Sequence, residues 1–153
     1  MKDFEERKAF LQLAREDERL LGELGRLLAP STRQLVERFY DHLLTFEETR
    51  RHLADPAVLR RLREAQSAYF QKLFAGDFGP DYLADRVRVG VAHNRVGLSP
   101  AWYIGAYALY VRLLLPEIRK AVDDDAKRFE ACVGSLLKPV FLDLGIAIDT
   151  YIS

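Results

Sequence analysis

One histidine near the middle of the chain has the surroundings that a metal-binding cofactor requires. His93 comes near the end of a stretch with helical spacing, and a Gly-Leu-Ser-Pro corner at residues 97–100 follows it. Val89 lies one turn earlier on the same helical face, and Val96 and Leu98 come just after the histidine. A neutral imidazole at the apolar end of a helix suits the axial position of a haem iron. His93 is therefore the candidate metal ligand, although a lone helical histidine is more often structural.

The other two histidines are expected outside this site. His52 follows a Thr-Arg-Arg run in a polar corner, where we expect solvent around its ring. His42 comes two residues after Tyr40 in a segment with helical spacing. At about 100° per residue, it points roughly 160° away from whatever Tyr40 faces.

Two further segments predict an apolar wall opposite His93. The segment 32–46 presents Phe39, Tyr40, Leu43 and Phe46. The segment that starts at Pro56 presents Val58, Leu62, Ala65 and Tyr69 along one face. Together these side chains form a slot for a flat ligand, with the Tyr40 hydroxyl in position to enter it.

The Tyr40 hydroxyl is a candidate hydrogen-bond donor to a gas molecule in this slot. Bound dioxygen carries partial negative charge and carbon monoxide carries less, so a donor in a dry pocket favours dioxygen. A hydrogen bond contributes about 0.5–1.5 kcal/mol between neutral groups and about 1.5–3 kcal/mol to a charged group. The corresponding change in ligand affinity is roughly three- to a hundred-fold. The alternative is a core tyrosine whose hydroxyl lies at the rim.

The aromatic residues after the corner belong to the next helix. Tyr103 comes just after the chain reverses, so its hydroxyl is expected to return to the imidazole of His93 and fix its tautomer. Trp102 and Tyr107 have the helical spacing of ordinary core aromatics.

All long segments have helical period, so the sequence predicts an all-α fold. We expect helices over residues 3–13, 16–28, 32–46, 56–75, 80–97, 100–120 and 126–152, with a short polar corner over 47–53. Capping residues predict most of the boundaries: Ser31, Asp55 before Pro56, Gly76, Ser99 before Pro100, and the acidic run 123–125. Capping is a stronger interpretation of that acidic run than a metal site.

Composition places the chain among ordinary globular domains. It has 153 residues, 49% of them apolar, and its 23 basic and 23 acidic residues cancel. This balance argues against nucleic acid or an anionic membrane as a partner. Cys132 is the single cysteine, which excludes an intrachain disulfide and favours a reducing, cytoplasmic setting. We expect no signal peptide and no apolar stretch of membrane-spanning length.

Several stretches together resemble the sensor globins, the haem domains of globin-coupled sensors. The matching stretches are Phe39-Tyr40-Asp41-His42-Leu43-Leu44, Ala65-Gln66-Ser67-Ala68-Tyr69-Phe70 and residues 86–98, with Trp102-Tyr103 after them. The His-x-Arg-Val-Gly-Leu stretch followed by Trp-Tyr is the specific part. The resemblance covers essentially the whole chain, including a helix ahead of the usual globin helices.

The resemblance implies a globin fold, in the sensor variant with an extra N-terminal helix, that binds haem b. By this likeness His93 is the proximal iron ligand, Tyr40 is the distal donor to bound oxygen, and Leu62 is a distal leucine that limits water entry. Tyr103 matches a proximal-side tyrosine. Ala65 departs from the family, because some members carry a hydroxyl residue there; Tyr40 is then the only polar contact unless Gln66 swings in.

The resemblance also implies partners. The ligand would be oxygen, with carbon monoxide and nitric oxide as further ligands, and the domain would dimerise through its last two helices. Small residues on the last helix agree with close helix approach: Ala131, Gly134, Ser135 and Gly145. Family members are usually fused to a chemoreceptor signalling region, a diguanylate cyclase or a kinase. We expect residues 1–153 to be one sensor domain, which is either cut from such a protein or a member without an effector; the apolar helical pattern at its end favours the former. The 97–100 corner is expected to pass the signal to the next helix.

Two other classes of function remain open. A haem-free helical interaction module would need His93 or the apolar slot to be absent, and the sequence has both. A haem enzyme, such as a peroxidase or a nitric-oxide dioxygenase, would need a distal acid or base. Leu62 and Ala65 supply no such group.

Overall fold

The computed structural model describes residues 2–152 of the chain, and its side chains from residue 3. Every regular element in this range is helical. The α-helices are α1 (Lys2–Phe10), α2 (Arg15–Leu28), α3 (Thr32–Leu43), α4 (Glu47–Arg50), α5 (Pro56–Ala75), α6 (Pro80–Arg95), α7 (Pro100–Ala121) and α8 (Ala126–Ile152). Two short 3₁₀ turns, Ala29–Ser31 and Arg51–Leu53, join α2 to α3 and α4 to α5.

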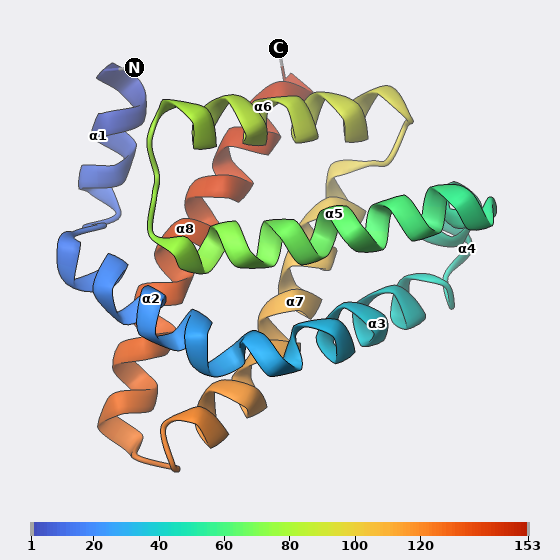
Figure 1. Cartoon of the computed structure of the whole chain (residues 1–153). Coiled ribbons are helices and arrows are strands. Elements are labelled where there is room, and N and C mark those ends of the chain that lie inside the picture. The colour runs from blue at the N-terminus through green and yellow to red at the C-terminus, as the bar shows by residue number, and fades with distance from the viewer. Residues whose placement is uncertain (1, 153) are drawn as a thin grey trace.

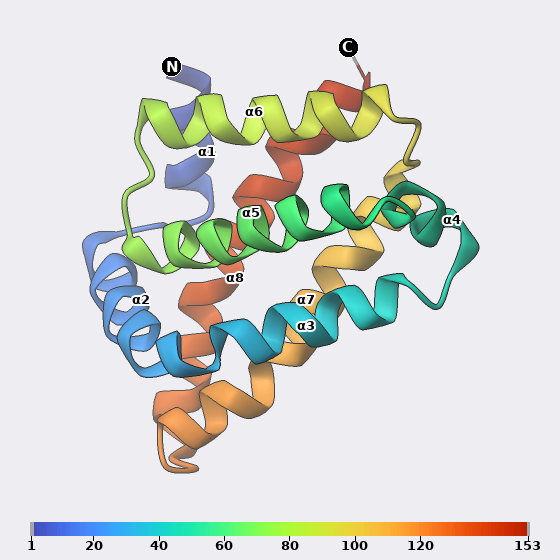
Figure 2. The same ribbon diagram turned by 45° about the vertical axis from the view of Figure 1, so that its right-hand side comes forward.

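The long helices form two crossing layers. In Figures 1 and 2, α6, α5 and α3 lie one above another, and α7 and α8 run behind them. Helix α8 packs against α6, α7 and α2, while α3 packs against α5 and α7. The most deeply buried side chains come from α2, α5, α7 and α8, and they include Leu21, Phe70, Leu73, Leu114, Ile118 and Leu136. This core leaves a space between α3, α5, α6 and α7, where the predicted site residues lie.

Capping groups set most of the helix ends, as the sequence predicts. The Asp55 carboxylate accepts a hydrogen bond of 2.9 Å from the backbone NH of Ala57, one residue after Pro56. Gly76 ends α5 in the left-handed conformation, with φ of 79°. Asp125, the last residue of the acidic run, accepts hydrogen bonds from the amides of Lys127 and Arg128 and caps α8 as expected. The exceptions are Ser31 and Ser99, whose side chains make no capping bond.

Three helices end earlier than the sequence suggested, of which α6 does so by only two residues, at Arg95 rather than at residue 97. Helix α1 ends at Phe10 rather than at residue 13, because Gln12 takes the left-handed conformation, with φ of 59°. Helix α3 ends at Leu43 rather than at residue 46. There the Thr49 hydroxyl bonds to the Leu43 carbonyl, which closes the polar corner onto the end of the helix. The backbone at residue 46 is extended as a result.

Helix α8 departs from one sequence expectation. By length and composition alone this helix could cross a membrane, so the expectation of no such stretch is wrong. Half of its most apolar window is buried inside the protein. Leu136, Val140 and Ile146 lie in that interior, which accounts for the apolar character of the helix as core packing.

Candidate functional site

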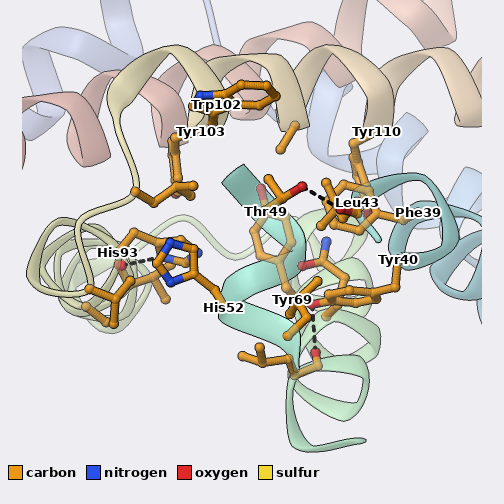
Figure 3. Close-up of a pocket in the computed structure, with 18 of the residues that line it drawn as sticks. Phe39, Tyr40, Leu43, Thr49, His52, Tyr69, His93, Trp102, Tyr103 and Tyr110 are labelled. Atoms are coloured by element: carbon orange, nitrogen blue, oxygen red, sulfur yellow. Dashed lines mark hydrogen bonds between the residues drawn. The ribbon is translucent and has the colours of Figure 1, made fainter. Parts of the chain in front are cut away.

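A cavity of about 430 Å³ opens between α3, α5, α6, α7 and the corner at residues 49–53 (Figure 3). Cofactor and small-molecule sites usually have volumes of about 300–1,000 Å³ and mostly apolar walls. The structure brings together the predicted residues Phe39, Tyr40, Leu43, Val58, Leu62, Tyr69, Val89, His93, Val96, Leu98 and Tyr103. Phe46 and Ala65 are the two predicted residues that do not line it.

His93 is held so that one ring nitrogen is left for a ligand. Its Nδ1 lies 2.7 Å from the carbonyl oxygen of Val89, one turn earlier on α6, and donates a hydrogen bond to it. The Nε2 atom then carries the free lone pair, which is the form that binds metals. Burial lowers the pKa of His93, with the Val89 bond opposing that shift, so the ring is neutral at neutral pH.

The expected role of Tyr103 is wrong in one respect. Its ring packs edge-to-face against the imidazole of His93, with centroids 4.9 Å apart. Its hydroxyl, however, lies 3.5 Å from the hydroxyl of Tyr107. The backbone of α6 fixes the tautomer of His93, because Nδ1 points back along its own helix to Val89.

Tyr40 brings a hydroxyl to the other side of the cavity. The side chain is buried, and its hydroxyl donates a hydrogen bond of 3.1 Å to the carbonyl of Leu62 on α5 (Figure 3). Burial raises the pKa of Tyr40 to about 12, so the hydroxyl keeps its proton and remains a donor.

Phe46 and Ala65, the two predicted residues that lie outside the cavity, are directed away from it for physical reasons. Because α3 ends early, Phe46 is 44% exposed and stacks against His42 and Trp102 instead of entering the cavity. Ala65 is exposed on α5, and the neighbouring Gln66 lines the cavity in its place.

His52 contradicts the expectation that it is solvated. Its ring lines the cavity (Figure 3), and its Nε2 atom is buried with no hydrogen-bond partner among the described residues. The 3₁₀ turn at Arg51–Leu53 rotates the side chain inward, which the polar sequence around it conceals. His42, by contrast, is exposed and lies outside the cavity, as predicted.

Sequence reasoning missed several other lining residues: Thr49, Leu53, Arg61, Arg86, Ala92, Trp102, Ala106, Tyr107 and Tyr110. On α7 a signal was present, because residues 103, 106, 107 and 110 have the spacing of one helical face. Arg86 comes two turns before His93 on the same face of α6. The corner residues gave no such signal, because they belong to no regular period.

These residues fit a haem. The cavity is walled by apolar and aromatic side chains, and the free Nε2 of one imidazole belongs to that wall. A single imidazole holds an iron when a porphyrin supplies the other ligands. The orphaned Nε2 of His52 is a second polar atom that needs a partner, and a cofactor with a polar edge can provide one.

Comparison with known proteins identifies the family. The protoglobin family model matches residues 1–153. The chain belongs to the protoglobin family. One relative of this protoglobin is the "Heme-based aerotactic transducer HemAT" of Halobacterium salinarum, 36% identical over 127 residues, which are 77% of this chain and 26% of the relative. The protoglobin thus spans about a quarter of that relative's length.

A solved structure resembles the protoglobin along nearly its whole length. The globin domain of the Geobacter sulfurreducens globin-coupled sensor superposes with a TM-score of 0.89 at 29% identity, over 97% of each chain. The expected all-α globin fold and the resemblance to sensor globins are both confirmed.

Proposed function

We propose that this protoglobin domain binds haem b, senses oxygen through it and passes the ligand state to an effector region. The observation that carries the proposal is the pairing of the free Nε2 of His93 with the Tyr40 hydroxyl across one apolar cavity. The relatives support it, since one is named a haem-based aerotactic transducer and another a globin-coupled sensor. The domain is a sensor rather than a catalyst.

The residues around the cavity have separate roles in this proposal. Bound haem supplies an iron at which a gas molecule binds. His93 would hold this cofactor through Nε2, and the Val89 carbonyl keeps the ring in the tautomer that this requires. The Tyr40 hydroxyl, which bonds to the Leu62 carbonyl, would be the hydrogen-bond donor toward a gas ligand, and the apolar Leu62 side chain would keep water out. Carbon monoxide and nitric oxide would bind in the same place, with less help from Tyr40.

Dimerisation through α7 and α8 is part of the proposal. Ile104 on α7 and Phe141 on α8 are 44% and 55% exposed, and such exposed apolar side chains favour a helical interface. Gly134 leaves open space beside α8, and Gly145 has only the end of the Arg7 side chain nearby, at 3.9 Å. Ser135, which was expected at this interface, cannot belong to it, because its side chain is buried and donates a 2.8 Å hydrogen bond to Asp17. The effector in the full-length protein is proposed to be a chemoreceptor region, a diguanylate cyclase or a kinase.

The absorption spectrum of the purified domain tests the proposal directly. The domain is supplied with haemin, reduced, and measured under nitrogen, oxygen and carbon monoxide. We expect a haem spectrum that differs among the three conditions and that His93→Ala abolishes. A chain that stays colourless with haemin is a haem-free interaction module, and a spectrum that is unchanged in His93→Ala places the iron on another side chain.

A further inference from the structure

A buried ion pair ties α8 to the helix that carries His93. Asp143 of α8 is fully buried, with 0% of its surface exposed. Its Oδ2 atom accepts a hydrogen bond from the Tyr69 hydroxyl and lies 3.8 Å from Nε of Arg86 on α6. The Arg86 guanidinium also stacks over the Tyr69 ring, 4.0 Å from its centroid. Arg86 and Tyr69 line the cavity, whereas Asp143 lies behind them.

Arg86 continues this contact toward the proximal histidine. Its Nη2 donates a hydrogen bond of 3.1 Å to the hydroxyl of Tyr107. That hydroxyl lies 3.5 Å from the hydroxyl of Tyr103, whose ring packs against the imidazole of His93. A continuous series of contacts therefore runs from the carboxylate of α8 to the iron-ligand position.

The backbones of the same two helices touch beside this network. At Gly90, one turn before His93, a Cβ atom would lie 2.6 Å from Oγ1 of Thr150 and 3.0 Å from Cα of Ala147. Asn94 reaches the carbonyl of Thr150 at 3.5 Å. With such close packing, α6 moves against α8 only if this interface changes as well.

The ion pair between Arg86 and Asp143 does not use all the hydrogen-bonding atoms of its two side chains. Nε of Arg86 and Oδ1 of Asp143 are buried and make no hydrogen bond of good geometry among the described residues, although the Tyr82 hydroxyl also faces Asp143. Buried charges are costly, and removal of Asp143 leaves Arg86 with Asp85, 3.8 Å from its Nη1 atom, as its remaining carboxylate partner. Arg86 can improve its bonding either toward Asp143 or toward Tyr107, so its position depends on both sides.

We propose that Asp143 is a positioning residue for the haem pocket, which acts through Arg86, Tyr107 and Tyr103 on the setting of His93. Coupling between two sites is reciprocal, so the occupant of the pocket also biases the position of α8. A change in the ligand at the pocket would then reach α8 through its contact with α6, in addition to the route through the corner at residues 97–100. This inference rests on the proposed haem binding.

A second buried carboxylate on the α2–α8 contact provides a matched control. Asp17 is 7% exposed, bonds to Nζ of Lys138 at 2.8 Å and accepts the hydroxyl of Ser135. None of these three residues lines the haem cavity. Asp17→Asn therefore breaks a buried ion pair of α8 without touching the network.

The experiment compares wild type, Asp143→Asn and Asp17→Asn. We expect Asp143→Asn to change the oxygen dissociation rate by about two- to thirty-fold, the range usual for coupling through packed networks. It should also abolish the change in amide hydrogen exchange of residues 143–152 that haem uptake causes in the wild-type chain. Asp17→Asn should leave both measurements at the wild-type values.

Other outcomes overturn the proposal in distinguishable ways. If Asp143→Asn matches wild type in both measurements, Asp143 does not position the pocket. If Asp17→Asn has the same effects, general destabilisation explains them. If wild type takes up no haem, the proposed function fails first. If Asp143→Asn does not fold, Tyr107→Phe replaces it in both measurements, because this variant keeps the ion pair and removes the hydroxyl that links Arg86 to Tyr103.

Discussion

The Nδ1 atom of His93 lies 2.7 Å from the carbonyl oxygen of Val89, one turn earlier in the same helix. Because a backbone carbonyl cannot be removed by substitution, the tautomer of His93 is built into α6 and does not depend on a neighbouring side chain. Most metal-bound histidines receive this support from a carboxylate, a carbonyl or a water. His93 thus already has the tautomer that the proposed haem site requires.

The first prediction concerns the imidazole itself. His93→Gly should bind haem weakly, and added imidazole should restore the wild-type spectrum, because the vacated space lies in the wall of the cavity. His42→Gly is the control, since His42 is exposed and lies outside the cavity. Haem titrations followed by absorption measure both variants. Equal loss of haem in the two variants would contradict the role of His93.

The second prediction concerns the distal hydroxyl. Tyr40→Phe should speed oxygen release by roughly three- to a hundred-fold and leave carbon monoxide release nearly unchanged, since oxygen carries more charge. Tyr110→Phe is the control, because the Tyr110 hydroxyl also belongs to the cavity wall but has no partner among the described residues. Stopped-flow release of the two gases measures the effect. If Tyr110→Phe alone speeds oxygen release, Tyr110 is the donor.

The third prediction concerns water. The Leu62 side chain lines the cavity, so Leu62→Ala should admit water and shorten the lifetime of the oxygen complex. The hydrogen bond from Tyr40 goes to the backbone of Leu62 and survives the substitution. Leu59→Ala, a neighbouring α5 residue packed on the main core, is the control for lost packing. The rate of spontaneous oxidation in air measures the difference, and equal rates in the two variants would exclude a barrier at Leu62.

The fourth prediction concerns pH. Burial raises the pKa of Asp143 from 3.8 to about 6, while Arg86 and the Tyr69 and Tyr82 hydroxyls lower it and Asp85 raises it. Between pH 4 and 6 the folded state therefore holds more protons at this site than the unfolded state. The free energy of unfolding consequently falls as pH rises through this interval, by roughly 1–3 kcal/mol in total.

Asp143→Asn removes this contribution. Urea unfolding of the haem-free domain from pH 4 to 8 should show a steeper fall for wild type than for the variant, and a constant difference only above about pH 7, where the carboxyl is ionised in both states. Parallel curves across the whole range would show that Asp143 has an ordinary pKa in the folded state.

The sequence predicts much of this molecule because helices leave local traces. The apolar period and the caps at Asp55, Gly76 and Asp125 mark the helices, and the surroundings of His93 indicate that it lines the cavity. Irregular segments have no apolar period and no capping pattern, so the sequence does not predict where their side chains point. The direction of His52 depends on a 3₁₀ turn, and the loss of Phe46 from the site depends on the early end of α3.

Long-range polar pairs are also hidden in the sequence. Asp143 interrupts an apolar stretch, and the sequence alone does not reveal that Arg86, far away in the chain, lies opposite it. Such a pairing is set by how α6 and α8 cross, which depends on side-chain volumes along both helices.

The last prediction tests the packing of those two helices. Gly90→Ala puts a methyl group 2.6 Å from Oγ1 of Thr150 and 3.0 Å from Cα of Ala147, so α6 and α8 must separate. We expect a loss of about 1–3 kcal/mol in the free energy of unfolding, the usual cost of overpacking. Gly22→Ala is the control, because Gly22 also lies in a helix but has only the flexible Arg26 side chain nearby, at 3.9 Å. That substitution should stabilise the domain by about 0.5–1 kcal/mol, because alanine loses less backbone entropy than glycine on folding. Since the two changes are chemically identical, opposite signs in urea unfolding would isolate the α6–α8 contact, and a stabilising Gly90→Ala would show that the helices are not in close contact there.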